Sequence, residues 1–133
     1  MTTAVDTSVL IAIVKGEPEA ERWVDVLHGA RGEGDLIICD VVAAELFAAL
    51  MDRRKFERAL GNLGIVLAAT TMESAQMAGM LFKTYREQGG PREHLVPDFL
   101  IGAHAAAQAG RIAAIDRGYL RRYFPRLKIL RPR

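Results

Sequence analysis

The chain has 133 residues, half of them hydrophobic, with a net charge of +2 and one cysteine. This length suits a single globular domain with its own core, and Cys39 alone excludes a disulfide framework or a cysteine-based zinc site. No apolar run reaches the roughly 18 residues of a membrane span, and the first residues lack the features of a signal peptide. We therefore expect a cytoplasmic protein without membrane contact.

The first half of the chain alternates short apolar runs with helical patterns. Strands are predicted at 3–6, 36–39 and 65–68, and helices at 8–15, 19–30, 41–51 and 54–63. Pro18 suits the start of the second helix, and glycines from position 29 onward predict a loose connection after it. Asp40 is the predicted N-cap of the third helix, because its carboxylate can accept from the first free N–H groups.

The second half continues the alternation. A helix at 71–87 capped by Thr71, a loop at 88–91 and a helix from Pro97 to Gln108 are followed by strands at 112–115 and 128–130, with a short helix at 119–123 between them. Gly110 is the predicted C′ residue of the Pro97 helix. Strands alternating with helices predict one α/β domain over residues 1–133, with a mostly parallel sheet covered on both faces.

Four acids stand in apolar surroundings. Asp6 follows the first strand, Glu45 is the only charge between 41 and 51, Asp98 lies in the first turn of its helix, and Asp116 follows the fourth strand. Such carboxylates are costly unless a positive charge receives them. Oxygen-only ligands suit Mg²⁺ or Mn²⁺, and the carboxyl ends of parallel strands form a common ligand edge. We therefore predict that the four acids meet in one metal pocket.

Each acid also has a structural alternative. Asp6 can cap the next helix, Glu45 can pair with an arginine, Asp98 can interact with the helix dipole, and Asp116 can belong to an ordinary turn. His28 and His94 have no acidic or histidine partner at metal spacing, and His104 points about 240° around the helix from Asp98. We interpret them as packed or surface residues.

The end of the chain is basic. From position 111 onward a single acid accompanies Arg111, Arg117, Arg121, Arg122, Arg126, Lys128, Arg131 and Arg133. Guanidinium groups suit phosphate recognition, so this segment is either a nucleic-acid contact or a solvated surface. Arg117, Arg121 and Arg122 follow Asp116 closely and are predicted to hold a phosphate backbone. Ser8 can cap a helix or contact the water shell of the metal.

Several segments together resemble a known family. They are Asp6-Thr7-Ser8, Glu45 within an apolar helix, the run from Pro97-Asp98-Phe99 to Ala105, and Asp116-Arg117-Gly118-Tyr119 followed by Tyr123-Phe124-Pro125. In this order they resemble a PIN domain, and within that family the VapC toxins of bacterial toxin–antitoxin pairs. Such toxins often carry Thr or Ser two residues before the fourth acid, where this chain has Ala114.

The resemblance implies a parallel sheet of four or five strands and an endoribonuclease that depends on Mg²⁺ or Mn²⁺. Asp6 and Asp98 would be the principal metal ligands, and Glu45 and Asp116 would complete the pocket directly or through water. It also implies a VapB-like antitoxin, which could place an arginine among the acids. Trp23 and Phe47 are candidates for the groove that takes the antitoxin's helix.

Two other functions remain open from the sequence. A phosphatase of the haloacid-dehalogenase type would also place an Asp after the first strand, but it needs a second Asp where this chain has Ser8. A non-catalytic PIN-like module that binds RNA or protein is the other alternative. A homodimer is also expected, with apolar Phe47, Met51 and Met80 suited to a helical interface.

Overall fold

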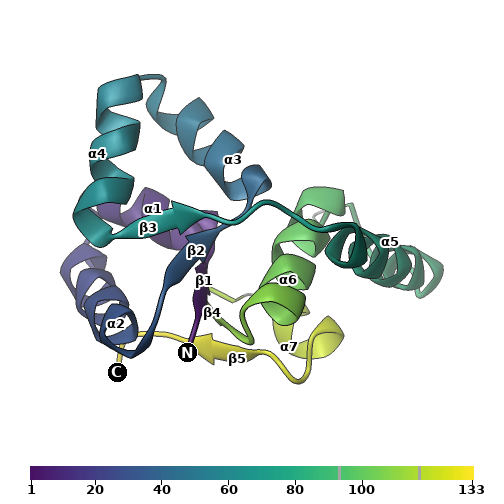
Figure 1. Cartoon of the computed structure of the whole chain (residues 1–133). Helices are drawn as coiled ribbons and strands as arrows, with labels where there is room; N and C mark the ends of the chain where they lie inside the picture. The colour runs from purple at the N-terminus through teal and green to yellow at the C-terminus, as the bar shows by residue number, and fades with distance from the viewer. Residues whose placement is uncertain (93, 117) are drawn as a thin grey trace.

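A computed structural model describes the whole chain except residues 93 and 117. Its five strands form one sheet in the order β3-β2-β1-β4-β5, and every neighbouring pair is parallel. The sheet crosses the middle of the molecule (Figure 1). The strands are β1 (Thr3–Val5), β2 (Leu36–Ile38), β3 (Ile65–Leu67), β4 (Arg111–Ala113) and β5 (Lys128–Leu130).

Helices connect the strands and cover the sheet. Figure 1 shows α2 and α4 on the left of the sheet and α5, α6 and α7 on its right. In the part of the chain that is described, no helix is both long and apolar enough to traverse a bilayer. The helices are α1 (Thr7–Val14), α2 (Ala20–Glu33), α3 (Asp40–Leu50), α4 (Arg53–Leu63), α5 (Met72–Glu87), α6 (Val96–Gln108) and α7 (Tyr119–Tyr123). The predicted α/β architecture is confirmed.

The central strands owe their place to apolar side chains on both faces. Every residue of β1, β2 and β4 is buried, whereas β3 and β5 at the two edges are partly exposed. Continuous burial is what a parallel strand between two helical layers requires. The largest fully buried side chains include Leu10, Leu27, Leu36, Ile38, Leu46, Phe99, Ile112 and Leu120.

The second helix differs from its prediction. It begins at Ala20 with Glu19 as N-cap, and it continues to Glu33 through the glycines at 29 and 32. Trp23, Leu27 and Ala30 are buried at helical spacing. Their burial offsets the roughly 1 kcal/mol that each interior glycine costs, which is why local propensity predicted the end of this helix wrongly.

Asp40 is not the N-cap of the third helix, as the sequence predicted. The cap is Cys39, and Asp40 is the first residue of α3. The Asp40 carboxylate accepts from the backbone N–H and the hydroxyl of Thr70, at 3.0 and 2.6 Å, and these bonds lower its pKa. Asp40 therefore fastens the segment after β3 to α3, while Thr71 caps α5 as predicted, by accepting from Ser74 N–H.

His104 is a packed residue, in agreement with the prediction. Its side chain is 1% exposed, and Nε2 lies 2.7 Å from the carbonyl oxygen of Ala68. Burial lowers the pKa of His104, so the neutral imidazole is the form that the core accommodates. One turn later, Gln108 donates to the carbonyl of Ala69, and α6 thereby holds the β3–α5 connection.

Arg111 is a structural residue and does not belong to a phosphate-binding surface. It is 3% exposed, its Nη1 lies 2.9 Å from Glu33 Oε2, and its Nε donates to Thr3 Oγ1 at 2.6 Å. Because Arg111 opens β4 and Thr3 opens β1, this cluster lies at the amino edge of the sheet. The predicted nucleic-acid contact can therefore begin only later in the basic segment.

Candidate active site

Asp6 stands where β1 ends and α1 begins. Its backbone N–H donates to the carbonyl of Ala113 at the end of β4, at 2.9 Å, and its side chain caps α1 by accepting from Ser8 N–H at 3.2 Å. The Ser8 hydroxyl also donates to Asp6 Oδ2. Burial raises the pKa of the Asp6 carboxyl despite these bonds. The capping role is thus real, and it leaves a desolvated carboxylate that a cation would stabilise.

Glu45 reaches the same edge from α3. Its Oε1 accepts from the Thr7 hydroxyl at 2.7 Å. This hydrogen bond ties Glu45 to the residue that follows Asp6, although the two are 38 positions apart in the sequence. Within the described residues its partner is this hydroxyl, and not the arginine of the structural alternative. Glu45 is exposed on its helix, which leaves its carboxylate accessible to a ligand.

Asp98 is the third residue of α6. Its Oδ2 accepts from Leu95 N–H at 2.9 Å, which is the capping arrangement of a helix start. The same oxygen lies 3.8 Å from Nδ1 of His94. The prediction that His94 has no acidic partner is therefore wrong: the two are four residues apart, and the turn into α6 brings them together.

Asp116 follows the fourth strand and accepts hydrogen bonds from the start of α7, whose N-cap is Gly118. Its Oδ1 accepts from the backbone N–H groups of Gly118 and Leu120, at 2.9 and 3.2 Å, and its side chain is only 4% exposed. The second oxygen, Oδ2, is buried and has no hydrogen-bond partner among the residues that the structure describes, and its cationic neighbour is Nε of Arg121 at 3.6 Å. One carboxylate oxygen thus serves the fold, and the other is left for a cation.

Tyr119 is close enough to all four acids for their charges to act on its hydroxyl, and it was not among the predicted site residues. Burial raises the pKa of its hydroxyl first, and the charges of Asp6, Asp98, Asp116 and Glu45 raise it further. The hydroxyl also lies 3.5 Å from the carbonyl oxygen of Asp98. The signal that identifies Tyr119 is its place three residues after Asp116, in the first turn of α7.

The four acids have the chemistry of a cation site, but their carboxylates are not arranged around a common point. Within residues 1–92, 94–116 and 118–133, no three histidine, cysteine or acidic side chains form a group ready to hold a metal ion. Local hydrogen bonds to Ser8, Thr7, Leu95 and the start of α7 engage the four carboxylates instead. The oxygen-only donor set nevertheless fits a hard divalent ion, and so does Asp116 Oδ2, which accepts no hydrogen bond from the described residues.

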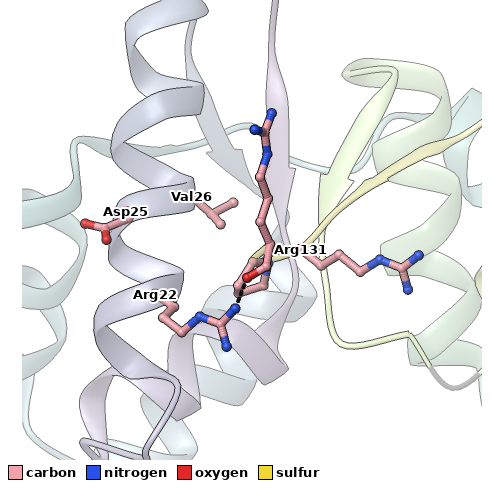
Figure 2. Close-up of a pocket in the computed structure, with 6 residues that line it drawn as sticks. Arg22, Asp25, Val26 and Arg131 are labelled. Carbon is pink, nitrogen blue, oxygen red and sulfur yellow. Dashed lines mark hydrogen bonds between the residues drawn. The ribbon is translucent and has the colours of Figure 1, made fainter.

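The basic residues after Asp116 divide between two regions. Arg121 contacts Asp116, and Arg122 lies over the ring of Tyr123 at 5.5 Å, while Arg117 lies outside the described residues. The last residues instead border a hollow of about 360 Å³ beside α2, lined by Arg22, Asp25, Val26, Arg131, Pro132 and Arg133. Figure 2 shows Arg22 on α2 beside the end of the chain, where its Nη2 donates to the carbonyl oxygen of Arg133.

The fold and the site define a small parallel α/β domain with an acidic site at the carboxyl edge of its sheet. The family model of the PIN domain matches residues 3–125. The chain therefore belongs to the PIN-domain family, as its motifs predicted. No curated protein matches the chain in sequence.

Solved structures share this fold at low identity. A chain in the structure of VapBC2 from Rickettsia felis bound to a DNA fragment from their promoter has a TM-score of 0.76 and 16% identity, over 98% of each chain. VapBC-1 from nontypeable Haemophilus influenzae gives 0.71 and 15%, over 98% of this chain and 97% of the other. FitAcB from Neisseria gonorrhoeae gives 0.70 and 21%, over the same shares.

Proposed function

We propose that the chain is a divalent-metal-dependent endoribonuclease and the toxin of a toxin–antitoxin pair. PIN domains are generally nucleases, and membership of this family supports hydrolysis of phosphodiester bonds. The observation that carries the proposal is the Asp116 Oδ2 oxygen, which is buried without a hydrogen-bond partner among the described residues, at the edge of the sheet where Asp6 also lies. The toxin assignment is supported by the similarity of fold to chains named VapBC.

The metal would be Mg²⁺ or Mn²⁺. Asp6 and Asp98 would bind it as principal ligands, and Glu45 and Asp116 would do so directly or through water. When bound, such an ion supplies positive charge that acidifies water and offsets the charge developing on phosphate. The site's hydrogen bonds would then rearrange, since the oxygens of Asp98 and Glu45 now accept from Leu95 and Thr7.

Other residues of the chain position the acidic side chains and orient the RNA. Ser8 fixes the rotamer of Asp6, and Thr7 fixes that of Glu45. Tyr119 is protonated at neutral pH, as any tyrosine with an ordinary pKa of 10 is, and its raised pKa keeps it so at alkaline pH. It therefore serves as a neutral hydrogen-bond donor near the acids. Arg121 lies beside Asp116, where a phosphate of the RNA would meet both the guanidinium and the acidic pocket.

Other substrate contacts are proposals of the same kind. Ser8 borders the site through Asp6 and accepts from the Ile115 N–H at 3.4 Å. Arg122 is exposed on α7, where a phosphate backbone could reach it. Arg117 is proposed from its sequence position alone. These contacts would give affinity and orientation but little discrimination between bases.

The partner would be a VapB-like antitoxin that covers the acids, with an arginine taking the place of the metal through charge-assisted hydrogen bonds. Phe47 is 38% exposed and available to such a partner. Trp23 is only 3% exposed and packs in the core, so the expectation that it lines the antitoxin groove is wrong. For a homodimer, Met51 and Met80 offer apolar surface, at 74% and 64% exposure.

Growth and RNA integrity in cells test the proposal. Inducing the chain alone should halt growth, and co-expressing the protein encoded beside it should restore growth. Sequencing of RNA 5′ ends should show new ends that are absent when Asp6→Asn is induced at the same level. Normal growth with abundant, folded wild-type protein would refute the toxin assignment, and unchanged 5′ ends would refute the ribonuclease.

A further inference from the structure

A hollow of about 200 Å³ opens between the end of α5 and the start of α6. Phe82, Arg86, Arg92 and Leu95 line it. Arg86 and Arg92 are exposed, and Arg86 is steadied by a 2.7 Å hydrogen bond from its Nη1 to the carbonyl of Gly90. The hollow therefore presents two guanidinium groups, and none of the described residues that line it is acidic.

This hollow adjoins the acidic site. The N–H of Leu95, one of its lining residues, donates to Asp98 Oδ2 at 2.9 Å. The ring of Phe82 packs edge-on against Phe99 at 5.6 Å, and Phe99 lies 6.0 Å from the ring of Tyr119. A molecule bound in the hollow would thus contact Leu95, and Leu95 is hydrogen-bonded to Asp98, one of the proposed metal ligands.

The lining combines two kinds of chemistry. Leu95 is 51% exposed, a large share for an apolar side chain beside a polar site, and Phe82 adds a half-buried aromatic ring. Apolar and aromatic side chains bind the faces of nucleobases, and guanidinium groups bind phosphates with paired hydrogen bonds. Both kinds of side chain line the same hollow.

We propose that the hollow binds one nucleotide of a single-stranded RNA next to the scissile phosphate. Its base lies against Leu95 and Phe82, and its phosphate is bound by Arg86 and Arg92. This rests on the proposed ribonuclease function and adds a base-sensitive position to it. A helical protein segment fits less well, because one turn of helix, about 10–12 Å across and 5.4 Å long, fills roughly 400–600 Å³.

RNA binding by variants that cannot cut tests the proposal. All variants carry Asp6→Asn, and the affinity for a short single-stranded RNA is measured by fluorescence anisotropy at several salt concentrations. Arg86→Ala and Arg92→Ala should each weaken binding about tenfold and flatten the salt dependence by roughly 0.7 units of slope. Arg54→Ala, an exposed arginine on α4, is the matched control and should bind like the parent.

An abasic site moved along the RNA tests the base contact. One register should lose affinity with the parent protein. Leu95→Ala truncates an exposed side chain and leaves the N-cap of α6 without a side-chain hydrogen bond, as it is now. It should abolish that difference with little change in the melting temperature. Arginine variants that bind like Arg54→Ala, or equal affinity for all abasic registers, would overturn the proposal. Cleavage by the wild-type chain is assayed in parallel. If the wild type cuts RNA but the variants bind RNA like the parent, only the proposed nucleotide site is refuted. If the chain neither cuts nor binds RNA, the ribonuclease function is refuted as well.

Discussion

Replacing Asp6 with asparagine should raise the melting temperature of the metal-free chain. Burial raises the pKa of this carboxyl above its ordinary value of 3.8, so the folded chain holds the proton more tightly than the unfolded chain. The associated stability is present below pH 3.8 and is lost as the pH rises through the folded pKa. At neutral pH the ionised carboxylate therefore destabilises the fold, while asparagine keeps the N-cap.

A divalent ion should reverse this order. At a hundred times its dissociation constant, a ligand stabilises the folded state by about 2.7 kcal/mol. An unfolding entropy of about 2.1 cal/mol/K per residue amounts to about 0.28 kcal/mol/K for 133 residues. Mn²⁺ should therefore raise the melting temperature of the wild type by roughly 10 °C, and that of Asp6→Asn by clearly less.

Thermal unfolding followed by circular dichroism, with EDTA or with Mn²⁺, measures both effects. Asp35→Asn is the matched control, because Asp35 is an exposed aspartate just before β2, at the opposite edge of the sheet. It should leave the Mn²⁺ shift unchanged. A lower melting temperature for metal-free Asp6→Asn, or an equal Mn²⁺ shift in both proteins, would refute the reasoning about this carboxylate.

Three further changes probe the surroundings of the site. Gly102→Ala should cost about 1–3 kcal/mol in denaturant unfolding, because its new Cβ would lie 2.4 Å from the Phe124 ring; unchanged stability would contradict this packing. Burial lowers the pKa of His104 from 6.5, so stability should fall as the pH drops below 6.5, and His104→Gln should flatten that dependence. Tyr119→Phe should keep the fold and reduce RNA cleavage; equal cleavage would show that the Tyr119 hydroxyl has no role in the reaction.

The location of two acids was predictable from the sequence. Parallel strands end at one edge of a sheet. Asp6 directly follows β1, and Asp116 lies three residues after Ala113, where β4 ends two residues earlier than predicted. The structure places Asp6 N–H on the carbonyl of Ala113, three residues before Asp116. This position could be predicted because the apolar runs alternate with helical patterns, and a helix between two strands connects them as parallel neighbours.

Contacts between distant segments were not predictable in the same way. Glu45 meets Thr7, and Arg111 meets Glu33, through the packing of helices whose orientation no local pattern encodes. The glycines at 29 and 32 led to a predicted end of α2 that is too early, because intrinsic helix propensity does not include the stability gained by burying Trp23. Tyr119 and His94 were missed for a related reason: the loop before α6 and the helix α7 meet only in the folded chain, where the two rings stack at 4.5 Å.

Cleavage of a defined single-stranded RNA by the purified chain tests the ribonuclease most directly. Wild-type protein with Mg²⁺ or Mn²⁺ should produce discrete fragments, and EDTA should abolish them. Asp98→Asn, purified in the same way and with an unchanged circular-dichroism spectrum, should give none. Intact RNA with either ion, or the same fragments from the wild type and Asp98→Asn, would contradict the assignment of this acidic edge as a nuclease site.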